Sequence, residues 1–185
     1  MRIIPVNLKR HLTALVSLVL LCSTGFAEPA PQELMDKLKS ASKTDAPRVA
    51  AEIKTVWSRS GSAAMDLLLL RGRDAMEEGN FALAIEHLTA LTDHAPDFAE
   101  GFHARAEAYF RSDLYGPALD DLEITLALVP SHYEAIFGLA VMWQEFGDLH
   151  KAADLFDKVL EIHPNHGNAA QALERLKRDG IGREL

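Results

Sequence analysis

Cysteine is nearly absent from this chain of 185 residues, which contains only Cys22. A single cysteine excludes an internal disulfide and a cysteine-based zinc site, so packing alone must hold the fold together. Basic residues are also scarce, with 19 Lys+Arg against 27 Asp+Glu and a formal net charge of −8. This acidity argues against nucleic acid or an anionic membrane as the main partner, because both require a basic surface.

Sequence signatures of the common enzyme classes are missing as well. The chain has no glycine-rich phosphate loop, no G-x-S-x-G turn and no H-E-x-x-H metal motif. The acidic pairs Glu77/Glu78 and Asp120/Asp121 are adjacent in sequence, and neighbours on a helix point in different directions. Such pairs are typical of a helix face that is exposed to solvent. We therefore expect a protein that is not an enzyme and that uses no cofactor.

The histidines form no recognisable metal motif. His163 and His166 flank a Pro-Asn dipeptide, and His94 and His132 lie near equivalent positions elsewhere. A transition-metal site needs three or four ligands that converge. We interpret these histidines as ordinary polar turn residues and predict no metal site.

Long hydrophobic runs are limited to one segment near the N-terminus. Three basic residues precede an apolar run at 12–22, and the small residues Gly25 and Ala27 follow it. These three parts predict a secretory signal peptide over residues 1–27, cut before Glu28. The run is shorter than the roughly 20 residues of a transmembrane helix. An uncleaved N-terminal membrane anchor is the alternative.

A lipid anchor on Cys22 is disfavoured, because Leu21 stands where the lipoprotein signal needs a small residue. Removal of residues 1–27 leaves 16 Lys+Arg against 27 Asp+Glu, which is a formal charge of −11 with no cysteine. We expect an exported protein with no membrane contact beyond its signal sequence.

A repeat of 34 residues organises the rest of the chain, and its clearest mark is a proline that recurs as Pro96, Pro130 and Pro164. With each proline at position 32, the units are Met65–Phe98, Ala99–His132 and Tyr133–His166. Small residues recur at positions 8 and 20 and bulky ones at position 24, which suits two helices that cross closely. These residues are Gly72, Ala106 and Ala140, then Ala84, Ala118 and Ala152, then Leu88, Leu122 and Phe156.

Turn signals divide each unit into two helices. Gly79 and Gly147 mark the ends of first helices, and Pro117 suits the first turn of a second helix. The residues after the unit-ending prolines are good helix caps, and two glutamates follow at the spacing of a capping box. The expected caps are Asp97, Ser131 and Asn165, with Glu100 and Glu134 as the capping-box partners.

This pattern resembles the tetratricopeptide repeat, or TPR, over 102 of the 158 residues that follow the predicted signal peptide. The resemblance implies an all-α fold: a right-handed solenoid of antiparallel helix pairs with capping helices. Arg71 and Arg105 depart from the family pattern, because they occupy position 7, where a bulky apolar residue is expected. The stretch WSRSGSAAMDLLL also resembles small exported TPR proteins of Gram-negative bacteria, which implies a periplasmic location.

Capping segments are expected at both ends of a stack of repeats. Residues 28–64 are predicted to form a helical pair and a joint, packed against the first unit, with Ser62 as a helix cap. Residues 167–185 are predicted to form a capping helix that stops at Gly180, and a tail. The expected buried residues are Leu34, Leu38, Ile53, Val56 and Trp57 at one end and Ala170, Leu173 and Leu176 at the other.

Positions 2, 5, 9 and 12 of each first helix lie roughly 130° around the helix from its core face. The resemblance implies that these positions line a concave groove that binds extended or helical peptides. They are Asp66, Leu69, Arg73, Met76, Glu100, His103, Glu107, Phe110, Glu134, Phe137, Val141 and Gln144. Four carboxylates and five apolar side chains against one fixed cation favour a partner segment that is basic and amphipathic. The Lys and Asn with which some family members clamp a terminal carboxylate are missing from this set.

We therefore expect a non-catalytic protein–protein interaction module, a periplasmic adaptor or assembly factor that binds another protein in this groove. The alternative is a self-associating structural subunit of an envelope complex. In that case Trp57 or the C-terminal helix would make the contact.

Overall fold

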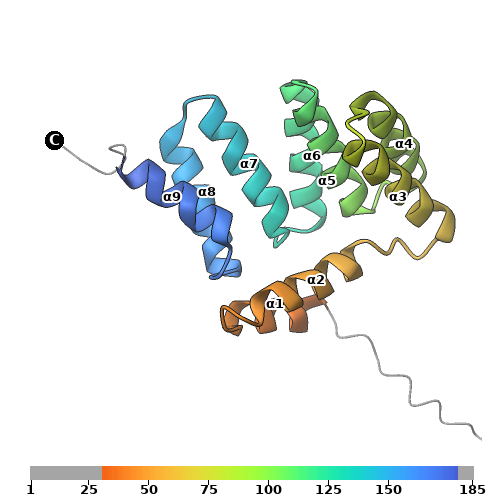
Figure 1. The fold of residues 1–185 in the computed structure, drawn as a ribbon. Helices are drawn as coiled ribbons and strands as arrows, with labels where there is room; N and C mark the ends of the chain where they lie inside the picture. The colour runs from red at the N-terminus through yellow and green to blue at the C-terminus, as the bar shows by residue number, and fades with distance from the viewer. Residues whose placement is uncertain (1–30, 179–185) are drawn as a thin grey trace, which may run out of the picture.

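The computed structural model describes residues 31–178, and this part of the chain is all helix and turn, without a strand (Figure 1). The predicted signal peptide and the predicted stop at Gly180 lie outside the described residues. None of the helices in this range is both long and apolar enough to span a membrane. The helices are α1 (Pro31–Ser40), α2 (Ala46–Trp57), α3 (Ala63–Glu77), α4 (Phe81–His94), α5 (Ala99–Arg111), α6 (Tyr115–Leu128), α7 (Tyr133–Glu145), α8 (Leu149–Ile162) and α9 (Gly167–Arg178).

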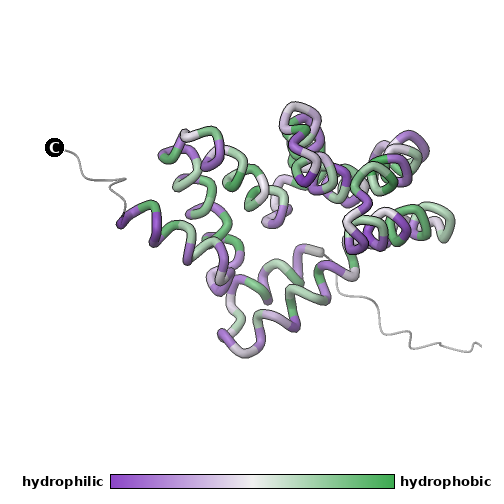
Figure 2. Tube along the Cα trace, turned by 45° about the horizontal axis from the view of Figure 1, so that its top comes forward, coloured by the Kyte–Doolittle hydropathy of each residue, from purple (hydrophilic) through white to green (hydrophobic). Residues whose placement is uncertain are grey.

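Three helix pairs, α3–α4, α5–α6 and α7–α8, stand side by side in a curved row, which confirms the predicted all-α solenoid (Figure 1). Hydrophobic and hydrophilic residues alternate along each helix, as expected when one face packs and the other meets solvent (Figure 2). The helices of a pair cross closely at the small residues. A Cβ atom on Gly72, for example, would lie 2.5 Å from Cγ of Leu88 in the facing helix.

The turns inside the units follow the glycine prediction. Gly79 and Gly147 have φ angles of +76° and +82°, in the left-handed region that glycine adopts at low cost. The middle unit has no glycine there, and Asp113 takes the same conformation with a φ of +58°. Its carboxylate accepts a hydrogen bond of 2.8 Å from the Tyr115 hydroxyl, and aspartate is one of the few residues that tolerate this region.

The caps between the units lie one residue later than predicted, so the capping-box prediction was wrong. Helix α7 is capped by His132, whose Nδ1 accepts a hydrogen bond of 3.1 Å from the Ala135 backbone N–H. His166 caps α9 in the same way through the Ala169 N–H, also at 3.1 Å. An imidazole nitrogen can therefore replace the carboxylate or hydroxyl that usually accepts this bond.

The N-terminal pair forms, but it does not pack on the first unit as predicted. Helices α1 and α2 lie across the open side of the row and reach α8 (Figure 1). Tyr133 and Ile162 join the apolar core of this hairpin, and the Asn165 side-chain amide donates a 2.9 Å hydrogen bond to the Ala41 carbonyl. Of the expected core residues, Leu34, Leu38 and Ile53 are buried, whereas Val56 and Trp57 are half-buried.

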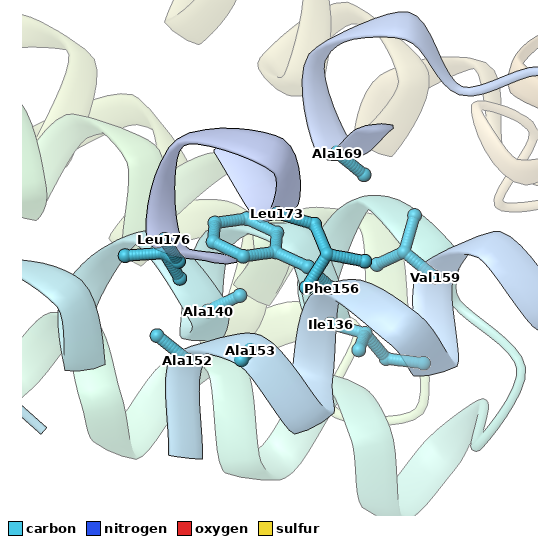
Figure 3. Packing of buried hydrophobic residues seen from close by; sticks show 9 residues of the cluster. All are labelled: Ile136, Ala140, Ala152, Ala153, Phe156, Val159, Ala169, Leu173 and Leu176. Atoms are coloured by element: carbon cyan, nitrogen blue, oxygen red, sulfur yellow. The ribbon is translucent and has the colours of Figure 1, made fainter. Parts of the chain in front are cut away.

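The outer face of α3 is uncovered because the hairpin packs elsewhere. Leu67 and Leu70 on this face are 44% and 54% exposed. The other end of the row is closed by α9, which places Leu173 and Leu176 against Phe156 of α8 (Figure 3). Ala169 is the fully buried small residue there, while the predicted Ala170 is half-buried.

Arg105 occupies an apolar position of the repeat because it forms a buried ion pair. Its guanidinium donates two hydrogen bonds to the Asp121 carboxylate, at 2.7 and 2.8 Å, and one to Thr92 Oγ1 at 2.7 Å. Asp121 is 3% exposed, so this bidentate pair links α5 to α6 inside the stack. Arg71, at the same repeat position, is exposed.

Arg105→Met is expected to lower the free energy of unfolding by about 3–5 kcal/mol, because it leaves the Asp121 carboxylate buried without its cation. The double variant Arg105→Met/Asp121→Leu should recover most of this loss. Arg71→Met is the matched control and should change stability by less than about 0.5 kcal/mol. Urea denaturation followed by circular dichroism measures all three, and a loss for Arg105→Met no larger than the control would contradict the role of the pair.

His163 is expected to make the fold sensitive to acid. Burial, and then the nearby charge of His166, lower the pKa of His163 to about 4. Since the unfolded chain has the ordinary value of about 6.5, the stabilisation is complete above that pH and is lost as the pH falls towards 4. Between pH 7 and pH 5 the wild type should lose about 1 kcal/mol more stability than His163→Leu, after allowance for solvent screening. Equal losses in urea titrations at the two pH values would refute this.

Candidate functional site

The first helices of the three units and helix α2 enclose a cavity of about 510 Å³. Eight of the twelve residues predicted for the groove line it, and they come from α3, α5 and α7. These eight are Arg73, Glu100, His103, Glu107, Phe110, Glu134, Phe137 and Val141.

The other four predicted groove residues do not line the cavity. Leu69 is 2% exposed in the apolar core that α3 forms with α4 and α5, and Met76 packs against the same core, since burial stabilises an apolar side chain. Asp66 accepts hydrogen bonds from the backbone N–H and the hydroxyl of Ser60, at 2.7 and 2.6 Å, and so holds the joint before α3. Gln144 lies half-buried on α7, away from the cavity.

Helix α2 forms a wall of the cavity that the sequence did not predict. Ala50, Ala51, Lys54 and Trp57 face the cavity from this helix. The Trp57 ring lies flat on His132, with ring centroids 4.0 Å apart and the planes at 15°. The hydrophobic pattern showed that Trp57 would be at least partly buried, but no local signal indicated which unit it would meet.

Glu100 is the centre of the polar side of the cavity. Its side chain is buried, with 4% of the residue exposed, and three other residues surround its carboxylate. Arg73 Nη2 donates to Oε1, His132 Nε2 lies 3.0 Å from Oε2, and His103 Nδ1 lies 3.5 Å from Oε2. Burial alone would raise the pKa of the Glu100 carboxyl, but His103 and His132 hold this pKa well below its ordinary value. Glu100 therefore stays ionised.

The two histidines beside Glu100 have opposite pKa shifts. Burial lowers the pKa of His132, and its bond to Glu100 offsets this only in part. Burial also opposes the charged form of His103, but Glu100, followed by Glu107 and Glu134, raises the pKa of His103 above its ordinary value. His103 is thus the histidine of this pair on which positive charge is favoured.

The ligand atoms of Glu100, His103 and His132 lie within 4.8 Å of one another, close enough to be considered as a metal site. The donor chemistry does not suit a metal, however. Because His132 Nδ1 accepts the Ala135 N–H, its proton is on Nε2, the atom that would have to bind the ion. Arg73 also already neutralises the Glu100 carboxylate through Oε1. The arrangement fits a network of ions and hydrogen bonds better than a metal centre.

A weaker copy of this network occurs one unit later. His166 Nε2 lies 3.7 Å from Glu134 Oε2, and burial, which would raise the pKa of Glu134, is outweighed by His166, so that this pKa is lowered. Glutamate at position 2 thus meets histidine at position 34 in two successive units. The interpretation of His132, His163 and His166 as ordinary polar turn residues was wrong, since all three are buried. Their recurrence beside the repeat boundary was the signal that could have found them.

Comparisons with known proteins agree with this architecture. A family model described as tetratricopeptide repeat matches residues 69–119 and 103–167, more than half of the chain. A TPR repeat-containing protein of Rhizobium etli is 28% identical over 155 residues, which are 81% of this chain and 76% of that protein.

Solved structures show the same likeness. The first TPR of Spaghetti (RPAP3), bound to the HSP90 peptide SRMEEVD, has a TM-score of 0.62 and 25% identity, and the match covers 65% of this chain and 98% of that one. The Sgt2 TPR domain of Aspergillus fumigatus has a TM-score of 0.60 and 25% identity, over 67% of this chain and 86% of that one. With three stacked helix pairs, the recurring small residues at their crossings and the matching family model, the chain belongs to the tetratricopeptide repeat family.

Proposed function

We propose that this chain is a non-catalytic protein-interaction module that binds a segment of a partner protein in its concave groove. The cavity between the first helices and α2 carries the proposal, because it combines apolar walls with charged groups that converge on one place. The related TPR of RPAP3 holds a peptide of another protein, which supports the same role here. The absence of any recognised catalytic motif in the sequence is consistent with binding alone.

The charges of the groove favour a basic amphipathic partner. Arg73 is neutralised by Glu100, whereas Glu107 and Glu134 remain partly exposed, Glu134 with His166 at 3.7 Å. The cation Lys54 also lines the cavity, but it belongs to α2 and not to the three units. Arg111 offsets Glu107 through a salt bridge of 3.2 Å, but both side chains are about half exposed, and such surface pairs are weak. An acidic peptide such as SRMEEVD would meet like charges in this groove, so we expect a different class of partner from that of RPAP3.

The compartment we propose is the bacterial periplasm, where the protein would act as an adaptor or assembly factor. Support comes from the signal-peptide pattern at residues 1–27, which does not depend on the groove.

Self-association is the second candidate, and the exposed pair Leu67 and Leu70 on α3 favours it. The contacts first considered for this role fit less well. Trp57 is engaged with His132 inside the groove. The outward side chains of α9 are polar, with Arg175, Lys177 and Arg178 in its last turn.

The double variant Phe110→Ala/Phe137→Ala should reduce capture of the partner from envelope extracts at least about tenfold. Two half-buried aromatic side chains of the groove are removed, and aromatic anchors carry much of the energy of an interface. Leu67→Ala/Leu70→Ala is the matched control, which also removes two apolar side chains but far from the groove. It should leave capture unchanged and should abolish any concentration-dependent mass in light scattering. Retained capture by the groove variant would rule the groove out.

The chain expressed in a Gram-negative host should be recovered from the periplasm with Glu28 as its first residue, because the small residues before this position suit signal peptidase. Intact mass and N-terminal sequencing measure this directly. Replacement of Ala27 by a bulky residue should retain the longer form, and a wild-type chain that keeps residues 1–27 in the membrane fraction would support the anchored alternative instead.

A further inference from the structure

Part of the groove is already filled by a helix of the chain itself. The residues of α2 that face the cavity, Ala50, Ala51, Lys54 and Trp57, recur at intervals that place them on one helix face. Trp57 rests on His132 and lies 5.4 Å from the Tyr133 ring, at the start of α7. The groove is therefore faced, in this structure, by a helix that presents two small residues, one cation and one aromatic ring, of which Trp57 packs on the stack while Ala51 and Lys54 are exposed.

The helix α2 belongs to a hairpin whose apolar core is mostly its own, with Tyr133 and Ile162 of the stack packed into it. Leu34, Leu38, Val49 and Ile53 pack together in it and are nearly inaccessible. An element that keeps its own core can move as one body, because its movement exposes only the side chains that tie it to the rest.

The ties between the hairpin and the stack can be named for the residues that the structure describes. They include the Trp57 stack, the packing of α1 on α8, the contacts of Tyr133 and Ile162, and two side-chain hydrogen bonds of 2.9 Å. One of these bonds joins Arg73 to Ser58 Oγ, and the other joins Asn165 to the Ala41 carbonyl. The joint that follows contains Gly61, which has a φ of +82° and open space around it. Asp66 holds Ser60 on one side of Gly61 through two hydrogen bonds, so Gly61 is the residue of the joint at which the chain can turn.

The space left under α2 is too small for a second helix. A cavity of about 510 Å³ is the size of a small-molecule pocket, for which roughly 300–1,000 Å³ is usual. A helix with its side chains needs a channel roughly 10 Å wide along its whole length. A partner helix can enter the groove only if the hairpin moves away.

We propose that the α1–α2 hairpin is a lid and that the partner is a basic helix that displaces α2. The incoming helix places an aromatic side chain on His132 and Tyr133, where Trp57 now lies, and a Lys or Arg near Glu107 and Glu134. The inference rests on the groove being the binding site, and it adds the kind of partner and the step that admits it.

The test uses the full chain and a labelled synthetic peptide of residues 45–60, which carries the groove-facing side of α2. Trp57→Ala removes the aromatic tie of the lid, and Thr55→Ala, on an exposed position of the same helix, is the matched control. Fluorescence anisotropy should show the peptide binding to Trp57→Ala at least about tenfold more tightly than to wild type or Thr55→Ala, because apparent affinity rises with the open fraction. A peptide with Lys54→Glu or Trp57→Ala should bind more weakly.

A second variant covers the case in which Trp57→Ala fails to fold. Asn165→Ala removes a tie of the lid outside the cavity, and loss of this one hydrogen bond should strengthen peptide binding about fivefold. Peptide affinity that is equal for wild type and both lid variants, or undetectable for both, would overturn the proposal. So would a dimer of Trp57→Ala in light scattering, since the occupant would then be the hairpin of a second copy.

The outcome is separable from that for the groove itself. Suppose that the lid variants do not strengthen peptide binding, but Phe110→Ala/Phe137→Ala loses capture of the partner. This result rejects the lid and keeps the groove as a binding site. If instead the peptide binds more tightly to the lid variants, but the double variant still captures the partner, the proposed function is rejected.

Discussion

A buried carboxylate needs compensating partners on every side, and around Glu100 these come from different parts of the stack. Arg73 extends from α3, His103 lies one turn along α5, and His132 stands at the boundary where α7 begins. The free energy of burying this charge is recovered only while all of them keep their places. The relative positions of the three units, and with them the shape of the groove, thus depend on one ionised side chain.

His132 makes the position of the hairpin depend on the same group of residues. His132 caps α7 with Nδ1, donates to Glu100 from Nε2 and supports Trp57 on its ring face. Each interaction uses a different part of the imidazole, so one residue couples a helix start, a buried charge and the packing of α2. Such a residue is difficult to replace, because no other side chain offers an acceptor, a donor and a flat ring in this geometry.

Most of the stack was predictable, because its determinants are local and recur in each unit. The prolines, the small residues such as Gly72 and the glycine turns at Gly79 and Gly147 report on contacts within one pair. The positions that line the cavity were predictable for the same reason in most of α5 and α7. The prediction failed at Gln144 of α7, and at Leu69, which packs in the apolar core that α3 shares with α4 and α5. The hairpin could not be placed, because its docking depends on Tyr133 and Ile162, which lie far away in sequence.

A solenoid can in general gain or lose units without changing its neighbours' packing. In this solenoid the number of units is constrained, because the hairpin that precedes the first unit also contacts the last unit. Asn165 and Ala41, which meet across this closure, are separated by 124 positions in the chain. A duplicated unit would carry the far end out of reach, and a deleted one would bring it too close. The hydrogen bond between Asn165 and Ala41 therefore forms only in an array whose length suits the hairpin, and here that array has three units.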